Sequence, residues 1–518
     1  MTGCVTEYDF KRGGREPLGN VLVLGLGVSG KSVARYCAGL LGSRVSSLFI
    51  AAGALNDDSQ AFVESLVGPG VEYAFGDDAL SRFEGQGLVF DMCIASPGIP
   101  YWHDLYVEGQ GVSREVMSEV EFAWRESDPN STWVAITGTN GKTTTTACCA
   151  EVLRSCGFAA NAVGNIGDVC LDAVAAGHTD VYVAEVSSYQ LYSTRYFAPD
   201  VAVMLNITPD HVHWHKTLEA YRDAKFKMLD NMTAARGRLQ DSQDTGVCPV
   251  AILDATNDVV RAKVRELKSL EREQRGFDYI PMGTADGISG DMRARCGAEN
   301  AAFISEDGVL HVAYGHADHA VINAADLQIK GQHNASNALA VAAVAVALGA
   351  RDDSIAEALK AFAPLEHRIE PCGSIAGVAC YNDSKATNVD ATIKALESFP
   401  NQRVVVLLGG DDKGTDLSEL VEAAYAHADV AVCFGDAGAR IKAAFEQSSA
   451  GMPSGFELVQ ACHLNDALDA GLGLAQSGDV LLLSPACASF DEFKSFEHRG
   501  EVFKQLVAQR AAAAEGDK

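Results

Sequence analysis

The sequence predicts an α/β protein built from three domains. Its 518 residues exceed the size at which one hydrophobic core keeps growing, so several domains are expected. Short apolar runs rich in β-branched residues alternate with helical stretches in three successive series, which is typical of parallel sheets covered by helices. The polar stretch Arg125–Thr132 is interpreted as a linker after the first series, and Ala363-Pro364 as the break before the third. We therefore place the domains at residues 1–128, 129–363 and 364–518.

The first series opens with a strand, a glycine turn and a helical stretch. The strand is Val21–Leu24, and the turn Gly25–Gly30 has the spacing G-x-G-x-x-G. This spacing raises the hypothesis of a nicotinamide-dependent oxidoreductase. That class expects an acidic residue about twenty positions on, where the apolar run Leu48–Ala52 stands instead. A turn that contacts the phosphate of another nucleotide, or a purely structural turn, is favoured.

Later strands follow the same pattern. In the second series each apolar run ends in polar residues, as expected where the carboxyl end of a parallel strand carries function. The pattern weakens between residues 236 and 332, where little can be placed beyond short runs such as Val309–Ala313. The expected strands are Val89–Ala95 in the first series, Trp133–Thr137, Val181–Ala184 and Val201–Leu205 in the second, and Arg403–Leu408, Val430–Phe434 and Val480–Leu483 in the third.

The central signal is the string ITGTNGKTT at Ile136–Thr144, between a strand and a helix. Its glycines let backbone N–H groups face phosphate oxygens, Lys142 can reach the terminal phosphates, and Thr143 can ligate magnesium. The spacing is shorter than in the standard phosphate loop, and a structural glycine turn is the alternative. We predict that ATP binds to Gly138, Thr139, Asn140, Gly141, Lys142, Thr143 and Thr144.

Two further groups near this loop suggest a metal. Glu185 directly follows the run Val181–Ala184, and a carboxylate at that edge of a sheet suits a magnesium ion. The alternating histidines His211, His213 and His215 suggest zinc at first sight. A zinc site is disfavoured because no cysteine cluster or His-Glu-x-x-His helix accompanies them. One histidine beside magnesium is left open.

Composition limits the classes of partner. The formal net charge of −28 would repel a phosphate backbone, so nucleic acid is not expected as a partner. The 14 cysteines form no Cys-x-x-Cys pair and suggest a reducing cytosol rather than a disulfide framework. The start of the chain has no apolar segment like that of a signal peptide, and the run Ala338–Ala350 is too short to cross a membrane. We expect a cytoplasmic protein with no membrane segment.

Taken together, the motifs resemble those of the Mur ligases, and the match covers all three expected domains. The C-terminal strings are similar to those of the family members that add D-glutamate. Besides the phosphate loop and Glu185, the strings are NITPDH from Asn206, His333-Asn334-x-x-Asn337, NDSKATN from Asn382, Gly409-Gly410 with Lys413, and SPACASFD from Ser484 with Phe496 and Arg499-Gly500.

The resemblance implies a Rossmann-like N-terminal domain, a P-loop ATPase-like central domain and a Rossmann-like C-terminal domain. These would bind the UDP-linked substrate, ATP and the amino acid respectively. The implied activity is the ATP-dependent ligation of D-glutamate to UDP-N-acetylmuramoyl-L-alanine through an acyl phosphate, in peptidoglycan precursor synthesis. The implied enzyme is a monomer that uses ATP and two Mg²⁺ ions.

The resemblance also implies roles for individual residues. Lys142, His211 and Lys225 would be catalytic, and Lys225 would be carbamylated to become a magnesium ligand. Metal ligands would be Thr143, Glu185, His211 and Lys225. ATP would also meet Asn334, Asn337, Arg368 and Asp383. The UDP-substrate would meet Ser29, Ser96 and Asn165, and D-glutamate would meet Lys385, Thr387, Lys413, Ser489 and Phe496.

Several alternatives stay open. Arg368 and Lys413 would otherwise be solvated surface cations, and Phe496 a core aromatic. The run Leu48–Ala52 lacks the Asp-Thr-Arg-like string with which some relatives hold uridine diphosphate, so contacts there are not assigned. A ligase of the same family with another amino acid, or a nucleotide-binding scaffold without catalysis, are the competing functions.

Overall fold

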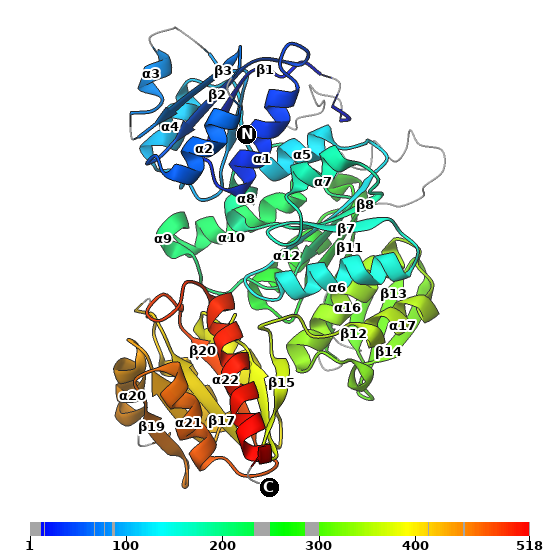
Figure 1. The fold of residues 1–518 in the computed structure, drawn as a ribbon. Coiled ribbons are helices and arrows are strands. Elements are labelled where there is room, and N and C mark those ends of the chain that lie inside the picture. Colours follow the sequence, from blue (N-terminus) through cyan, green and yellow to red (C-terminus); the bar gives the residue numbers. More distant parts are fainter. Residues whose placement is uncertain are drawn as a thin grey trace. The chain divides into compact units, whose positions relative to one another are not determined.

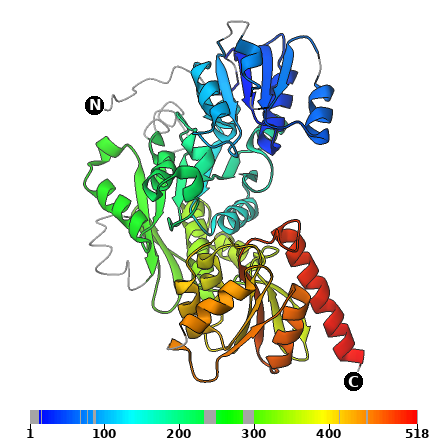
Figure 2. The same ribbon diagram turned by 90° about the vertical axis from the view of Figure 1, so that its left-hand side faces the viewer.

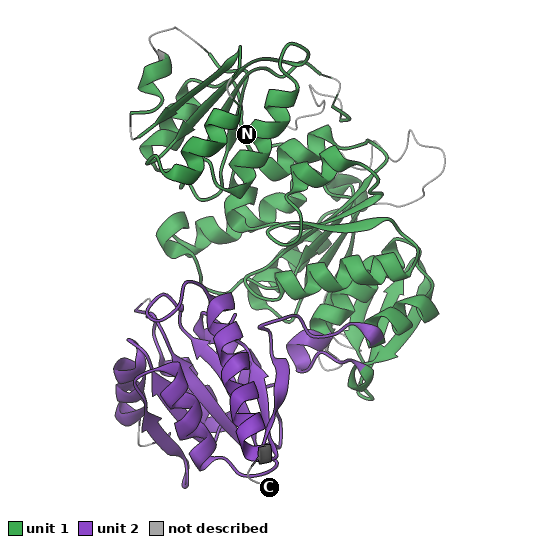
Figure 3. Ribbon diagram, in the orientation of Figure 1, with its two compact units in different colours: residues 1–326, 336–360 green, residues 327–335, 361–518 purple. Residues whose placement is uncertain are grey.

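The computed structural model describes residues 12–14, 16–66, 68–76, 78–84, 89–232, 249–284, 300–412, 414–448 and 451–516. Its strands form three sheets (Figure 1). The chain divides into two compact units, residues 1–326 with 336–360 and residues 327–335 with 361–518 (Figure 3). The first unit holds two of the sheets and the second unit holds the third, so each predicted series forms a sheet of its own.

The first sheet has five parallel strands in the order β3-β2-β1-β4-β5. This order fits the predicted Rossmann-like topology, in which the chain reverses direction of winding beside β1. The predicted strand at Val89 begins only at Met92, because Phe90 makes no more than an isolated bridge to Ser113. The strands are β1 Gly19–Leu24, β2 Val45–Ala52, β3 Val71–Phe75, β4 Met92–Ala95 and β5 Val116–Ser118, and the helices are α1 Val28–Gly39, α2 Asp57–Ser65, α3 Ser81–Glu84, α4 Asp104–Gly111 and α5 Glu119–Glu126.

The second sheet has nine strands in the order β14-β13-β12-β11-β10-β9-β6-β8-β7. Strands β6 to β12 pair parallel with one another, whereas β13 pairs antiparallel with both β12 and β14. The strands are β6 Thr132–Thr137, β7 Ala160–Gly164, β8 Val181–Glu185, β9 Val201–Met204, β10 Val250–Asp254, β11 Asp278–Thr284, β12 Ala301–Ile304, β13 Val309–Tyr314 and β14 Ala317–Asn323.

Helices of this part of the chain cover the second sheet or continue from its carboxyl edge. They are α6 Lys142–Ser155, α7 Cys170–Ala176, α8 Ser188–Tyr192, α9 Val212–His215, α10 Leu218–Phe226, α12 Asp258–Lys268, α13 Arg272–Arg275, α16 Gln332–Ala347 and α17 Asp352–Ala361, with 3₁₀ turns η1 Lys227–Leu229 and η2 Ala324–Asp326.

Strand β6 lies between β8 and β9, and this placement positions the site. The chain leads from this strand to one neighbour on one side and later to the other neighbour on the opposite side. Such a switch leaves a crevice outside the carboxyl end of the strand, which is where open α/β sheets bind ligands. The predicted phosphate loop leaves β6 at this point. Strand β1 occupies the same position in the first sheet, between β2 and β4, and the glycine turn follows it.

The third sheet has six strands in the order β15-β16-β20-β17-β18-β19, all parallel except for the antiparallel hairpin of β15 and β16. Helix α22 packs over β15 and β16 and is the long red helix in Figures 1 and 2. The strands are β15 Glu370–Ile375, β16 Val378–Asn382, β17 Val404–Gly409, β18 Val430–Phe434, β19 Glu457–Gln460 and β20 Val480–Ala486, and the helices are α18 Val389–Leu396, α19 Ser418–His427, α20 Gly438–Gln447, α21 Leu464–Leu474 and α22 Phe496–Gly516.

Helix α5 joins the first two sheets into one packed core, and the predicted linker therefore begins too early. Trp124 packs edge-on against Phe197, and both belong to one cluster of buried side chains that spans the two sheets. Arg125 is also buried, because it donates to the carboxylates of Glu115 and Glu121. Burial of each large side chain stabilises the packing by about 1.5–3 kcal/mol. Within the described ranges every helix is too short or too polar to cross a bilayer.

Candidate active site

The predicted phosphate loop connects β6 to α6, as expected. Gly141 takes a left-handed conformation, with φ of 83°, and α6 begins at Lys142. A side chain at Gly141 would be strained, and its Cβ would lie 2.6 Å from Oδ1 of Asn337 on α16. Asn337 is therefore placed directly against the loop, whereas Asn334 uses its amide to donate to the carbonyl of Lys330, 2.7 Å away.

The loop is held by the segment that follows β9. The side chain of Asn206 accepts from the N–H of Asn140 at 2.8 Å and donates to the carbonyl of Asn140 at 3.1 Å. The hydroxyl of Thr139 accepts from the N–H of Thr208 and lies 2.9 Å from the hydroxyl of Tyr221. Because these bonds fix the loop before any ligand arrives, its N–H groups are preorganised for phosphate.

Two lysines meet at one carbonyl of this loop. Lys142 donates to the carbonyls of Gly138 and Thr139, each at 2.8 Å, and Lys225 of α10 donates to the carbonyl of Gly138 at 2.7 Å. Lys225 is 2% exposed. Its burial lowers the pKa of the amine well below the usual value, and the nearby charge of Lys142 lowers that pKa further.

Glu185 is the last residue of β8 and is almost completely buried. The side-chain amide of Asn165, which follows β7, donates to Oε1 of Glu185 at 2.9 Å. Oε2 of Glu185 is buried without a hydrogen-bond partner among the described residues. A buried carboxylate oxygen with no partner is costly unless something else satisfies it. This oxygen fits the predicted magnesium ion, which takes oxygen ligands.

His211 precedes α9 with a positive φ of 54° and lies beside the ring of Tyr189, with centroids 4.9 Å apart. Burial lowers the pKa of His211 to about 4, opposed by the charge of Asp210 and reinforced by Lys142 and Lys225. The imidazole is therefore neutral at pH 7 and offers a lone pair to a metal. In His215, Nε2 is hydrogen-bonded to the hydroxyl of Ser188, and Nδ1 is buried without a hydrogen-bond partner among the described residues.

These side chains line one cavity of about 230 Å³. Lys142, Asn165, His211 and Lys225 all reach it, although they lie on four separate segments. Glu185 does not line the cavity itself but accepts a hydrogen bond from Asn165, which does. Thr143, next to Lys142 in the sequence, is half-buried. The full lining is Pro97, Gly98, Lys142, Asn165, Ser187, Ser188, Tyr189, His211 and Lys225.

The two serines predicted for the UDP-substrate border the first glycine turn. The hydroxyl of Ser96, which follows β4, donates to the carbonyl of Gly25 at 3.1 Å, and Ser29 is half-buried in the first turn of α1. Gly30 is the glycine that this packing requires, because a Cβ there would lie 2.0 Å from the carbonyl oxygen of Gly25. Pro97 and Gly98, directly after Ser96, line the central cavity.

In the second unit, Arg368 and Asp383 come together. Asp383 is buried after β16 and accepts from the hydroxyl of Ser484 at 2.7 Å and from the N–H of Ile369 at 3.2 Å. Burial raises the pKa of Asp383 to about 7, and these hydrogen bonds and the charge of Arg368 oppose the rise. The cation and the carboxyl group are thus close enough to interact, and their contacts with ATP stay a prediction.

Of the residues predicted to bind D-glutamate, the structure brings Lys385 and Phe496 into contact. The ammonium of Lys385 lies 3.6 Å from the ring centroid of Phe496, which is half-buried. Phe496 is thus a partner of a cation, in addition to any packing role. Thr387 is half-buried on the same loop as Lys385, and Ser489 is 2% exposed after β20. Lys413 lies outside the described residues.

Arg499 is a positioning residue that the sequence reasoning left without a role. Its buried guanidinium donates to the hydroxyl and carbonyl of Ser384 and to the carbonyls of Cys487 and Ala488. It therefore ties the loop before Lys385 to the segment before Ser489. Arg499 and Asn206 both belong to the motifs that resemble those of Mur ligases, so the sequence does carry a signal for them. Tyr189 and Tyr221 carried no comparable signal beyond their closeness to Glu185 and Lys225.

Two family models match the chain. Residues 136–345 match the Mur ligase middle domain, and residues 367–487 match the glutamate ligase domain of Mur ligases. The first match covers the phosphate loop and the lysines of the central cavity. The second covers Arg368, Asp383 and Lys385.

Curated relatives match over nearly the whole chain. A UDP-N-acetylmuramoylalanine–D-glutamate ligase from Koribacter versatilis is 34% identical over 492 residues, which are 95% of this chain and 97% of the relative. A protein of the same name from Bacillus cytotoxicus is 31% identical over 505 residues, 97% of this chain and 98% of the relative. Among solved structures, the UDP-N-acetylmuramate-alanine ligase from Thermotoga maritima has 17% identity and a TM-score of 0.51, covering 96% of this chain and 100% of its own, which supports the fold alone.

Proposed function

This chain belongs to the Mur ligase family, and we propose that it joins D-glutamate to UDP-N-acetylmuramoyl-L-alanine with ATP, a step in peptidoglycan precursor synthesis. The observation that carries the proposal is the convergence of Lys142, Asn165, His211 and Lys225 on one cavity backed by Glu185. The names of the full-length relatives support the choice of substrates.

The proposed reaction activates a carboxylate that is otherwise a poor electrophile. The carboxylate oxygen of the UDP-substrate takes the γ-phosphoryl group of ATP, which gives an acyl phosphate and ADP. The amine of D-glutamate then attacks the acyl carbon, loses a proton, and inorganic phosphate leaves as the amide forms. Positioning and electrostatic stabilisation of the transferred phosphoryl group supply most of the catalysis in such steps.

Lys142 is proposed to turn from the loop carbonyls to the phosphoryl oxygens. Its ammonium donates to the neutral carbonyls of Gly138 and Thr139, and a charged phosphate oxygen is a stronger acceptor than either. Gly138, Thr139, Asn140, Gly141, Thr143 and Thr144 would surround the phosphates, with Asn337 behind the turn. We propose Asn334, Arg368 and Asp383 as further nucleotide contacts.

Thr143, Glu185, His211 and Lys225 are proposed to hold two Mg²⁺ ions, which would neutralise charge on the phosphates when bound. The unpartnered Oε2 of Glu185 and the neutral imidazole of His211 support this assignment. Lys225 would serve as a ligand only after carbamylation, in which its neutral amine adds to carbon dioxide. The burial that lowers the pKa of Lys225 favours that neutral amine.

The three stretches 1–128, 129–363 and 364–518 are proposed to divide the substrates. Ser29, Ser96 and Asn165 would bind the UDP-substrate, and Lys385, Thr387, Lys413, Ser489 and Phe496 would bind D-glutamate. We further propose a cytoplasmic monomer. The eleven described cysteines are all free thiols, which supports a reducing compartment, and light scattering of the purified chain tests the monomer.

The test is phosphate release from ATP with UDP-N-acetylmuramoyl-L-alanine and each candidate amino acid in turn. D-Glutamate should give turnover, whereas L-glutamate, L-alanine and a diamino acid should not. Equal or faster turnover with another amino acid would show that the chain is a Mur ligase with a different amino-acid substrate. Absence of phosphate release with every amino acid, in protein that binds ATP, would favour a scaffold without catalysis.

A further inference from the structure

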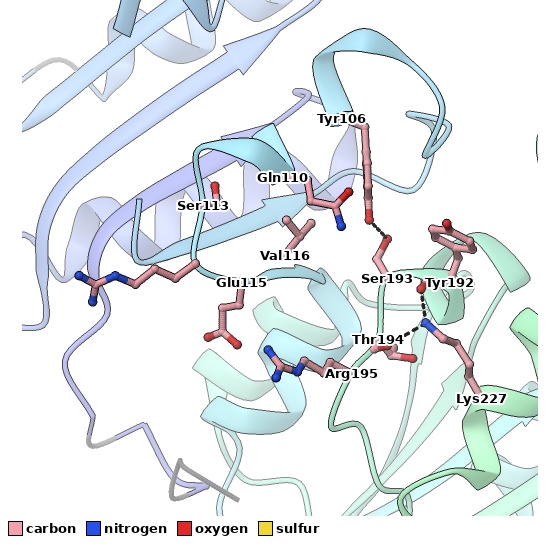
Figure 4. Close-up of a pocket in the computed structure, with 11 residues that line it drawn as sticks. Tyr106, Gln110, Ser113, Glu115, Val116, Tyr192, Ser193, Thr194, Arg195 and Lys227 are labelled. Atoms are coloured by element: carbon pink, nitrogen blue, oxygen red, sulfur yellow. Dashed lines mark hydrogen bonds between the residues drawn. The ribbon is translucent and has the colours of Figure 1, made fainter. Parts of the chain in front are cut away.

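A second, larger cavity of about 540 Å³ lies in the first unit and shares no lining residue with the candidate active site (Figure 4). Its walls come from α4, from the residues before and at the start of β5, from the segment after α8 and from η1. The start of β5 is the amino edge of the first sheet, whereas Ser29 and Ser96 follow the carboxyl ends of β1 and β4. The cavity is thus on the opposite edge of that sheet from the glycine turn.

The lining of this cavity is cationic in a strongly acidic chain. Arg114, Arg195 and Lys227 line it, and Glu115 is its one carboxylate. Glu115 is already engaged by both outer nitrogens of Arg125, at 2.9 and 3.1 Å. Arg114 is likewise paired with Asp91, so the positive excess of the lining comes from Arg195 and Lys227, although the chain has a formal net charge of −28.

The side chains of Arg195 and Lys227 both have N–H donors that are available to a ligand. The guanidinium of Arg195 lies over the ring of Tyr196, 4.8 Å from its centroid, and within the described part of the chain it makes no hydrogen bond or ion pair. The ammonium of Lys227 donates to the carbonyls of Tyr192 and Thr194, at 2.5 and 3.1 Å, which holds it at the wall of the cavity (Figure 4). An ammonium has three donors, so one remains for a ligand.

Neutral polar groups complete the lining. The hydroxyl of Tyr106 on α4 lies 3.0 Å from the hydroxyl of Ser193, and the amide of Gln110 borders the same space (Figure 4). Hydroxyl and amide groups can bond the remaining oxygens of a polar ligand. A volume of about 540 Å³ is in the range of pockets that take small organic molecules.

We propose that this cavity is a binding site for a small phosphate-bearing molecule, held by Arg114, Arg195 and Lys227. A guanidinium group can donate two parallel hydrogen bonds to two oxygens of one phosphate, and an ammonium adds a compact positive charge. These three cations therefore suit a phosphate, with its several charged oxygens, better than they suit a single carboxylate. The elements that line the cavity continue into the candidate active site. Helix α8 begins with Ser188 and Tyr189 at that site and ends with Tyr192 at this cavity, and Lys225 and Lys227 are two residues apart.

The test is calorimetric titration of the full chain with inorganic pyrophosphate, without magnesium and in a Lys142→Ala background that weakens the competing phosphate loop. In that background Arg195→Gln should reduce pyrophosphate affinity at least tenfold. The matched control Arg82→Gln removes an exposed arginine on α3, and it should leave the affinity within twofold. Binding should also weaken as salt is added.

The guanidinium of Arg195 contacts the Tyr196 ring, and the hydrogen bonds of this residue to Glu121 and Asn231 are made by its backbone, so replacement of the side chain should leave the thermal unfolding temperature unchanged. A second variant, Arg114→Gln, acts on an arginine paired with Asp91 at the surface and should also weaken pyrophosphate binding. Equal pyrophosphate affinities in the Arg195→Gln, Arg114→Gln and Arg82→Gln variants would overturn the proposal. Because binding is measured without catalysis, the result does not depend on which amino acid the enzyme ligates.

Discussion

The side-chain amide of Asn165 donates a hydrogen bond to Oε1 of Glu185, 2.9 Å away, while Oε2 of the same carboxylate is buried with no partner among the described residues. The hydrogen bond orients the carboxylate and leaves Oε2 available to bind a cation. An unpaired buried carboxylate oxygen weakens the folded state, and a bound cation would compensate for it.

Glu185→Gln should therefore raise the magnesium concentration needed for half-maximal phosphate release at least tenfold. The amide is the same size but has no charge with which to bind the ion. Thermal stability without magnesium should be equal or higher, because an incompletely paired buried charge is removed. The control is Asp168→Asn, which alters an exposed acid bonded to Asn161. An unchanged magnesium requirement in Glu185→Gln would remove Glu185 from the metal site.

Lys225→Ala should lose ligation, and formate or acetate should restore part of it. The small acid would replace the carboxylate that carbamylation is proposed to place on this buried amine. The fold should persist because Lys142 still donates to the carbonyl of Gly138. Lys263→Ala, on α12, is the control and should keep full activity with no response to formate. Full activity of Lys225→Ala without added acid would exclude the carbamate.

Ser489→Ala and Lys385→Met should raise the KM for D-glutamate while ATP binding is unchanged. Loss of a charge-assisted contact to a carboxylate should cost on the order of 2–4 kcal/mol of transition-state binding for Lys385, and loss of the Ser489 hydroxyl about 1 kcal/mol. Steady-state kinetics with D-glutamate as the varied substrate measure both. The controls are Ser418→Ala on α19 and Lys394→Met on α18, which alter solvent-exposed hydrogen-bonding groups. Wild-type dependence on D-glutamate in both pocket variants would place the amino-acid site elsewhere.

Glu119 should make the stability of the chain fall as pH rises from about 4.5 to 7. Burial raises the pKa of Glu119 from 4.5 to about 7, and the bond that it accepts from the N–H of Leu171 only partly offsets this. Below pH 4.5 the carboxyl is protonated in both states and its contribution is fully present. Between pH 4.5 and 7 only the unfolded chain ionises, so stability is lost.

Glu119→Gln should abolish this pH dependence and be more stable than the wild type at pH 8, by about 1–3 kcal/mol, because an amide oxygen can still accept from Leu171. Urea unfolding at pH 5 and pH 8 measures the difference. Glu64→Gln, at an exposed position on α2, is the control and should track the wild type at both pH values. Parallel curves for Glu119→Gln and the wild type would show that Glu119 is not the group responsible.

Gly30→Ala should destabilise the first sheet, whereas Gly27→Ala in the same turn should not. A Cβ at Gly30 would lie 2.0 Å from the carbonyl oxygen of Gly25, and no atom lies within 4 Å of the corresponding position at Gly27. The expected loss is about 1–3 kcal/mol, typical of overpacking. Hydrogen exchange of peptides from β1 and α1 should accelerate in Gly30→Ala alone. Similar exchange in both variants would contradict this.

Local motifs could be predicted from the sequence because they depend on backbone conformations that neighbouring residues enforce. The strand, glycine turn and helix around Gly138–Lys142 follow from apolar periodicity and from the left-handed φ that Gly141 supplies. The same reasoning located some of the strands in each of the three sheets. Between residues 249 and 323 it found β13 but missed β10, β11, β12 and β14. Strand β14 lies at the sheet edge with mostly exposed residues and lacks a clear apolar pattern, whereas β10 is buried throughout.

Only the tertiary structure decided how these motifs combine. From the sequence, Arg125 is interpreted as part of a polar linker. In the structure it is buried, and its charge is paired with the carboxylates of Glu115 and Glu121. The sequence alone does not tell a buried Lys225 from a solvated lysine, since its lowered pKa comes from desolvation and from Lys142, 83 positions away. The cavity around Arg195 has no motif at all. Burial, pKa shifts and cavities depend on residues distant in the chain, so they emerge only when the sheets pack.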